Sequence, residues 1–118
     1  MLIVCWKGKA ISVNKWHVVR NGKISPSREY EKFIDDLAWT IRAETKLRRY
    51  SKLNLNIDSK LKPNFDHQNL LKPICDAIQR SELLADDNNI KSIWMQEPQR
   101  HKKGELDEIW LYFTQLEN

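Results

Sequence analysis

Residues 52–58 read KLNLNID, and this stretch holds the pattern that decides the fold. Leu53, Leu55 and Ile57 alternate with polar residues, which is the period-two spacing of a strand with one buried face. From residue 66 to residue 79 the apolar side chains recur instead at the spacing of an amphipathic helix. The change from one period to the other predicts a sheet that packs against helices.

Further strands are predicted on both sides of this stretch. Asn21-Gly22 is a strong signal for a two-residue hairpin turn, and Gly104 marks a second turn before the C-terminal strand. The remaining strand predictions rest on short apolar or alternating runs. The predicted strands are residues 2–6, 16–20, 23–24 and 52–58, one that begins at residue 90, and residues 106–114.

Two helices are predicted. Ser25 is expected to cap the first, with Pro26 at its first helical position, and residues 30–41 provide its apolar face before it ends near residues 45–47. The second helix covers about 66–79, where Pro73 either kinks it or marks a late start. The expected fold class is α+β, with two layers: a mixed β-sheet packed with two main helices.

Length and composition limit the class of protein. The 118 residues suit one domain spanning residues 1–118. The chain contains no apolar run near the roughly 20 residues of a membrane span, so we expect no membrane association. Cys5 and Cys75 lie within apolar segments and are expected to be buried, reduced thiols of a cytosolic protein. With these two cysteines and three histidines, a structural zinc site is not expected.

The positive charge is concentrated in the first half of the chain. Residues 1–62 carry 14 Lys/Arg and 6 Asp/Glu, a net charge of +8, whereas residues 63–118 carry a net charge of −4. Basic clusters of this kind favour a polyanionic partner such as nucleic acid. The residues predicted to bind DNA are Lys46, Arg48, Arg49, Lys52, Lys60, Lys62, Arg100, Lys102 and Lys103.

Acidic residues in two segments indicate a metal-dependent phosphodiesterase site. Asp66 stands at the start of the second helix, and Asp86-Asp87 precede the next strand. Mg²⁺ prefers oxygen ligands and keeps positions open for water and phosphate. If the helix begins near Asn69, Lys72 points back toward the carboxylates and stabilises charge on the phosphate. Spacing alone favours simpler roles: a cap, a polar turn and a solvated lysine.

Asp76 lies too far along the second helix to share a metal with Asp66. The two are ten residues apart, or about 15 Å along a helix axis. We therefore expect Asp76 to cap, to pair with a basic residue or to support the site from behind.

Three motifs in this region occur in an order that resembles a known family. Residues 66–72 read DHQNLLK, residues 76–78 read DAI, and residues 86–90 read DDNNI. The combination is similar to the RusA family of Holliday junction resolvases, common in bacteria and prophages, with motifs Asp-x-Asp-Asn-x-x-Lys, Asp-Ala-Leu and Asp-Asp-x-Gln-Ile. An apolar strand, Ser12-Val13-Asn14, a hairpin and residues 25–30 extend the resemblance over nearly the whole chain.

The resemblance implies a homodimeric endonuclease that binds four-way DNA junctions and cuts them with Mg²⁺ during recombination and repair. It implies a cytoplasmic, nucleoid-associated protein, encoded by a bacterium or phage, without a small-molecule cofactor. Carried over residue by residue, the catalytic residues are Asp66, Lys72 and Asp87. The metal ligands are Asp66, Asp86, Asp87 and Gln68, and the supporting residues are Asn14, Asn69 and Asp76.

One acid of the family motif is an amide in this chain. In the gapless alignment the second acid is Gln68; in the alternative register, with an insertion at residues 67–68, the first acid is Asn64. The gapless register is preferred because it keeps the helix phase from Asn69 onward. Loss of one charge beside a divalent ion weakens its binding, by several kcal/mol at an effective dielectric constant of about 20. The alternative function is therefore a junction-binding protein with weak or no cleavage.

Overall fold

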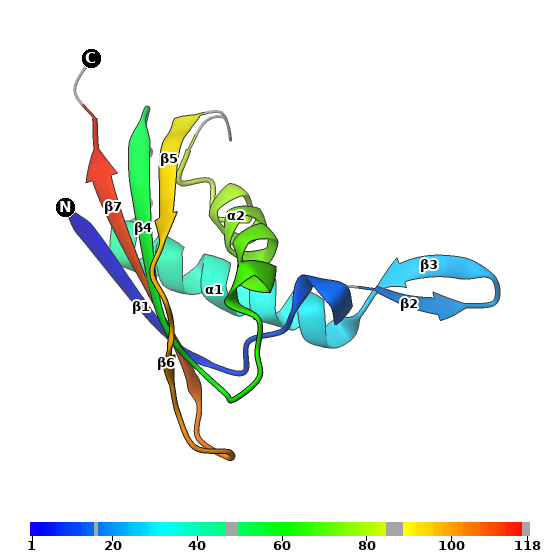
Figure 1. The fold of residues 1–118 in the computed structure, drawn as a ribbon. Helices are drawn as coiled ribbons and strands as arrows, with labels where there is room; N and C mark the ends of the chain where they lie inside the picture. The colour runs from blue at the N-terminus through cyan, green and yellow to red at the C-terminus, as the bar shows by residue number, and fades with distance from the viewer. Residues whose placement is uncertain (16, 47–49, 85–88, 117–118) are drawn as a thin grey trace.

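A mixed β-sheet with both long helices on one of its faces makes up the fold (Figure 1). The computed structural model describes residues 1–15, 17–46, 50–84 and 89–116. Within these ranges the elements are β1 (Leu2–Gly8), η1 (Val13–Lys15), β2 (His17–Arg20), β3 (Lys23–Pro26), α1 (Arg28–Thr45), β4 (Leu53–Leu61), η2 (His67–Leu70), α2 (Leu71–Arg80), β5 (Ile90–Met95), β6 (Gln99–Arg100) and β7 (Asp107–Gln115).

The strand order of the main sheet is β1-β7-β4-β5, and β6 also pairs with β4. The pairs β1–β7 and β4–β7 are antiparallel, whereas β5 and β6 run parallel to β4. Strands β2 and β3 form a separate two-stranded sheet. The predicted two-layer α+β class with a mixed sheet is confirmed.

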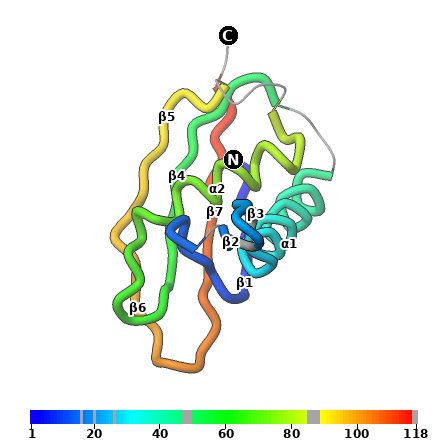
Figure 2. The backbone as a smooth tube through the Cα atoms, turned by 90° about the vertical axis from the view of Figure 1, so that its right-hand side faces the viewer, coloured from blue at the N-terminus to red at the C-terminus, as the bar shows by residue number. Residues whose placement is uncertain are grey.

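The helices cover the sheet face that carries the core. Viewed from the helix side, the strands follow in the order β5, β4, β7, β1, with α1 beside β1 (Figure 2). On β4, Ile57 is fully buried, whereas its neighbour Asn56 points to the other face and is exposed. Arg80 at the end of α2 binds Glu31 and Asp35 of α1, each at 2.8 Å. Among the described residues, neither helix is long and apolar enough to cross a membrane.

The local signals for turns and helix ends are mostly confirmed. Asn21 and Gly22 have φ angles of 52° and 75°, as a two-residue hairpin turn requires. Helix α1 ends at Thr45, and Lys46 adopts the left-handed conformation as its C-cap. Pro73 marks a late start, because it lies in the first turn of α2, where a missing N–H costs no intrahelical hydrogen bond.

Three expectations are wrong in detail. The cap of α1 is Ser27, whose side chain accepts the N–H of Tyr30 at 3.1 Å, and not Ser25, which lies in β3. Strand β6 is absent from the predicted strands, because its two polar residues show no alternation of apolar and polar side chains. Cys5 is exposed and Cys75 is half-buried. Cys5 lies on the face of β1 opposite Val4 and Trp6, and helices cover one face only.

A buried carboxylate joins three chain segments at one end of the sheet. Asp107, 3% exposed, begins β7. Its Oδ2 accepts the N–H of Ala10 at 2.9 Å, and its Oδ1 accepts the N–H of Lys62 at 3.0 Å. The Nε2 of His101 lies 2.5 Å from Oδ1. The loops after β1, β4 and β6 are thus held together by one side chain.

The imidazole of His101 is set up to carry a positive charge. Its Nδ1 faces the carbonyl oxygen of Lys102 at 2.7 Å, and its Nε2 faces the Asp107 carboxylate. A carbonyl and a carboxylate both accept hydrogen bonds, so both ring nitrogens act as donors, as they do only in the imidazolium form. The bond to Asp107, followed by the bond to Lys102, raises the pKa of His101 above its usual value.

We expect the free energy of unfolding to depend on pH through His101. Because the folded-state pKa is raised, the stabilisation is fully present below the unfolded value of about 6.5 and is lost as pH rises through the folded-state pKa. Urea unfolding of the native chain and of His101→Phe, from pH 5 to pH 9, measures this. The difference between them should be largest at the acidic end. A constant difference would show that the imidazole is neutral in the fold.

Candidate functional site

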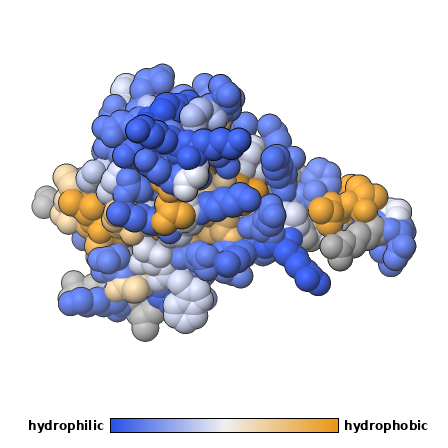
Figure 3. Space-filling model, turned by 90° about the horizontal axis from the view of Figure 1, so that it is seen from below, coloured by the Kyte–Doolittle hydropathy of each residue, from blue (hydrophilic) through white to orange (hydrophobic). Residues whose placement is uncertain are grey.

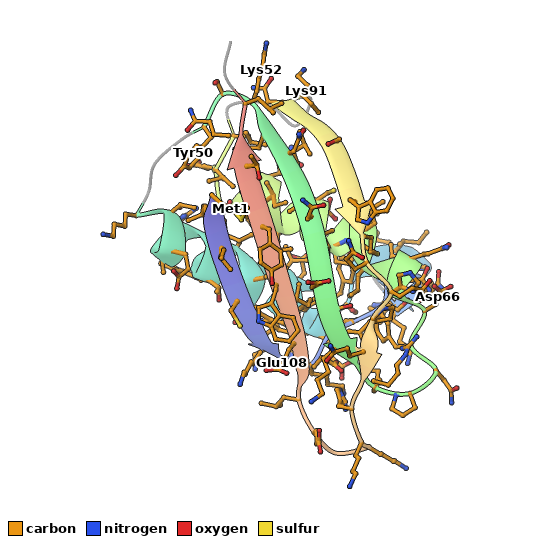
Figure 4. All side chains as sticks on the ribbon, turned by 60° about the vertical axis from the view of Figure 1, so that its left-hand side comes forward. Met1, Tyr50, Lys52, Asp66, Lys91 and Glu108 are labelled. Carbon is orange, nitrogen blue, oxygen red and sulfur yellow. The ribbon has the colours of Figure 1, made fainter. Side chains whose placement is uncertain are left out.

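Asp66 begins the helical segment that follows β4 and remains at the surface. Its Oδ1 accepts the backbone N–H of Gln68 at 3.0 Å, which starts η2. Both residues are exposed. Figure 4 places Asp66 at the edge of the molecule, beside the loop after β4. The capping role that spacing favoured is therefore present, and it holds an exposed carboxylate in one orientation.

The loop that presents Asp66 is anchored by Lys62 and Arg100. The guanidinium of Arg100 donates to the carbonyl oxygens of Phe65 at 2.7 Å and of Lys62 at 3.1 Å. The ammonium of Lys62 lies 5.1 Å from the centre of the Phe65 ring and 3.4 Å from the carbonyl oxygen of Ala10. Two residues that were predicted to bind DNA thus also shape the loop beneath Asp66.

A cavity of about 300 Å³ opens beside Asp66 and has a basic lining. Asn69, the second residue of the motif in this cavity, is half-buried. The charged side chains around the cavity come from the loops after β1 and β4 and from the first turn of α1. They are Lys9, Lys15, Lys62, Glu29 and Asp66. Three ammonium groups and two carboxylates therefore share one opening.

Lys72 pairs with Asp76 one turn along α2. Its Nζ lies 2.8 Å from Oδ2 of Asp76, and the lysine side chain is 62% exposed. The hydroxyl of Tyr30 donates to the same oxygen at 3.3 Å. Burial, followed by the charge of Asp76, raises the pKa of Tyr30 to about 12, so the hydroxyl keeps its proton. Asp76 thus pairs with a basic residue, one of the three roles expected of it, and links α2 to α1.

Asn14 lies in a groove next to the cavity. It belongs to η1, which packs against η2, and its N–H bonds to the Oγ of Ser12 at 3.1 Å. The groove, about 520 Å³, is polar and has Arg28 in its lining. Lys15 and Glu29 line both hollows. Asn14 therefore accompanies Asp66 at the same end of the molecule without lining the same cavity.

The residues predicted to bind DNA divide into two groups. Figure 4 shows Lys52 at one end of the sheet and Asp66 toward the other. The nine residues of β4 separate Lys52 from Lys62, a span of roughly 30 Å. Lys46 follows the C-terminus of α1. Lys60 and Arg100 belong to the end with Lys62, because β6 pairs there with β4, and Lys102 and Lys103 follow in the turn between β6 and β7. Arg48 and Arg49 lie outside the described residues. The described members of this set therefore lie at both ends of β4.

The oxygen atoms around Asp66 are of the type that Mg²⁺ binds, but few of them belong to negatively charged groups. Carboxylate and amide oxygens such as those of Asp66, Gln68 and Asn69 are ligands that Mg²⁺ accepts. In the described ranges no three His, Cys, Asp or Glu side chains come together as a metal group. Asp86 and Asp87, the other predicted acids, lie outside these ranges. A second negative charge at the cavity comes from Glu29, and any further acidic ligand depends on that pair.

Sequence reasoning missed the lysines on the N-terminal side of the cavity. Lys9 and Lys15 are far in sequence from Asp66, and only the fold brings them together. A signal was present, because residues 1–28 contain six Lys/Arg and no Asp/Glu. An acid-free segment of this length indicates a surface for an anionic partner.

We expect Lys72→Ala to leave stability almost unchanged. The pair with Asp76 is an exposed i,i+4 pair, and such pairs contribute about 0.5 kcal/mol or less. Chemical denaturation measures the change, with Leu70→Ala as the contrasting variant. Leu70 is fully buried, so its truncation should cost about 2–5 kcal/mol. A loss of that size for Lys72→Ala would mean that the lysine is chiefly structural.

Comparison with known proteins leaves the family open. No protein-family model matches the chain, and no curated protein is significantly similar to it.

Proposed function

We propose that this protein is a structure-specific DNA endonuclease of the RusA type, which cuts four-way junctions with the aid of Mg²⁺. The observation that carries the proposal is the cavity in which the exposed carboxylate of Asp66 and the amide of Asn69 stand beside three lysines. Phosphodiester hydrolysis needs both features, because a carboxylate can hold a divalent ion while ammonium groups bind the anionic backbone.

The basic lining of the cavity is the part that would bind DNA. Lys9, Lys15 and Lys62 come from two loops, and those loops share hydrogen bonds to Asp107. Their spacing is therefore set before DNA arrives, which lowers the ordering cost of binding. Phosphate contacts of this kind give affinity without base preference, and selectivity for a junction needs a further contact.

Asp66 and Asp87 would hold Mg²⁺, with Asp86 and Gln68 beside them. When bound, the ion lowers the pKa of a coordinated water and offsets charge on the scissile phosphate. Lys72 has a different task in the proposal. Its exposed ammonium, oriented by Asp76 at 2.8 Å, binds a phosphate oxygen and stabilises the negative charge that develops there.

A homodimer is part of the proposal. A four-way junction has paired strands to cut, and a dimer with two-fold symmetry presents one identical site to each. DNA recombination and repair, in the cytoplasm of a bacterium or in a phage-infected cell, would be the setting.

A second candidate is a junction-binding protein of the same fold that cuts weakly or not at all. Gln68 supports it, since an amide stands where the family motif has an acid. The number of acids supports it too. In residues 66–72, which correspond to the first family motif, Asp66 is the one carboxylate. The basic cavity serves both candidates equally, and cleavage is what separates them.

We expect the native chain to cut a labelled four-way junction in Mg²⁺ and not in EDTA. Asp66→Asn should abolish cleavage, and Lys72→Ala should slow it by at least about 100-fold through loss of charge stabilisation. Both variants should bind the junction within a few-fold of the native chain. Ile3→Ser, at an exposed position near the start of β1 and away from Asp107, is the control. Cleavage that survives Asp66→Asn would overturn the assignment.

If the native chain binds junctions without cutting them, Gln68→Asp should switch cleavage on. The substitution restores a second negative charge beside Asp66, which strengthens binding of a divalent ion. Gln79→Asp adds the same charge to an exposed position of α2 and should have no effect. Activity is read on the same junction over a Mg²⁺ titration. Equal activity of the two variants would argue against the gapless alignment.

A further inference from the structure

The β2–β3 hairpin, called the arm below (residues 17–26), stands away from the sheet and helices (Figure 1). Within the described residues its two strands pair only with each other. Val19 and Ile24 lie directly opposite one another in the register, and each is 65% exposed. Figure 3 shows the hydrophobic patch on the protruding arm. A two-stranded hairpin is marginally stable alone in water, so an apolar pair exposed on it is a candidate for contact with a partner.

The charge of the arm selects an anionic partner. From Lys15 to Arg28 the chain carries four Lys/Arg and no Asp/Glu. Lys23, next to the turn, is exposed. A second copy of the same arm would bring like charges together, which disfavours the contact. DNA instead offers phosphates to the cations and base faces to the apolar pair.

The arm is continuous with the cavity beside Asp66. At its base lies the polar groove of about 520 Å³, lined by Asn14 and Arg28 among others. Lys15 and Glu29 line both this groove and the Asp66 cavity. The hydroxyl of Ser27 donates to the carbonyl oxygen of Lys15 at 2.9 Å and fixes the base of the arm to η1. A DNA strand in the cavity therefore leads along the groove to the arm.

We propose that the arm recognises the branch point of the DNA by inserting Val19 and Ile24 against unstacked bases. Apolar side chains used in this way separate base steps at the cost of stacking energy. That cost is lowest where pairing is already interrupted, so the arm prefers a junction to a continuous duplex. The inference rests on the proposed function in that it takes DNA as the ligand, and it does not depend on cleavage.

The test uses a four-way junction with 2-aminopurine at the branch point, without Mg²⁺, and a linear duplex of the same sequence. The double variant Val19→Ser, Ile24→Ser removes the apolar pair. Val19→Ile with Ile24→Val exchanges the two side chains and keeps the apolar surface. Ile3→Ser is the matched control, since Ile3 is 51% exposed and lies in β1, outside the arm. Thermal unfolding of all four proteins should agree within a few degrees, because exposed substitutions change stability little.

We expect 2-aminopurine fluorescence to rise when the native chain binds. The serine variant should lose most of this rise and bind the junction about tenfold more weakly, with duplex affinity changed by less than about twofold. The exchanged variant and the control should behave as the native chain does. Junction binding and fluorescence unaffected by the serine variant would overturn the role of the arm while leaving the proposed function in place.

Two other results would also overturn the proposal. If the native chain binds neither the junction nor the linear duplex, the proposed function and the role of the arm both fail. If sedimentation velocity shows that the serine variant is a monomer and the native chain a dimer, the apolar pair is an interface between copies of the chain.

Discussion

The candidate site depends on one buried carboxylate. Asp107 binds the backbone of Ala10 and Lys62 and the ring of His101, and so it holds three loops at one end of the sheet. A buried carboxylate is stable only when its oxygens are paired. The three loops are therefore expected to keep or to lose their positions together. The cavity beside Asp66 is built from two of the three loops, although Asp107 does not line it.

A second set of contacts determines where the lysine of the motif stands. The α-helix begins after a 3₁₀ turn, with Pro73 inside its first turn, so Lys72 and Asp76 are one turn apart on the same side. Tyr30 donates to Asp76 from the neighbouring helix. The carboxylate thus orients Lys72 and fastens α2 to α1 at once. The cap formed by Asp66, which spacing favoured, and the pairing of Asp76 with a basic residue, which was one of its expected roles, both orient residues of the candidate site.

The candidate site could be predicted in part. The order of Asp66, Asn69, Lys72 and Asp76 was readable because these residues are neighbours on one helical segment. The basic lining was not, because Lys9 and Lys15 reach the cavity through pairing of β1 with β7 and of β7 with β4. The same pairing separates Lys52 from the cavity by the length of a strand. Which charge clusters meet in space is therefore decided by strand pairing: Arg100 reaches the loop that contains Lys62, whereas Lys52 does not.

The sequence by itself determined the class of fold, the strand in residues 52–58, the hairpin turn at residues 21–22 and the apolar face of α1, since these follow from side-chain period and local dihedral preference. Only the tertiary structure decided that β6 pairs with β4, that Ser27 caps α1 and that Cys5 faces away from the helices. The first and the last depend on which segments meet across the main sheet, and the cap depends on the hairpin register, in which Pro26 pairs with His17 and stays in β3. Non-local pairing carries no signature in a window of neighbouring residues, whereas burial of one sheet face settles it in the folded chain.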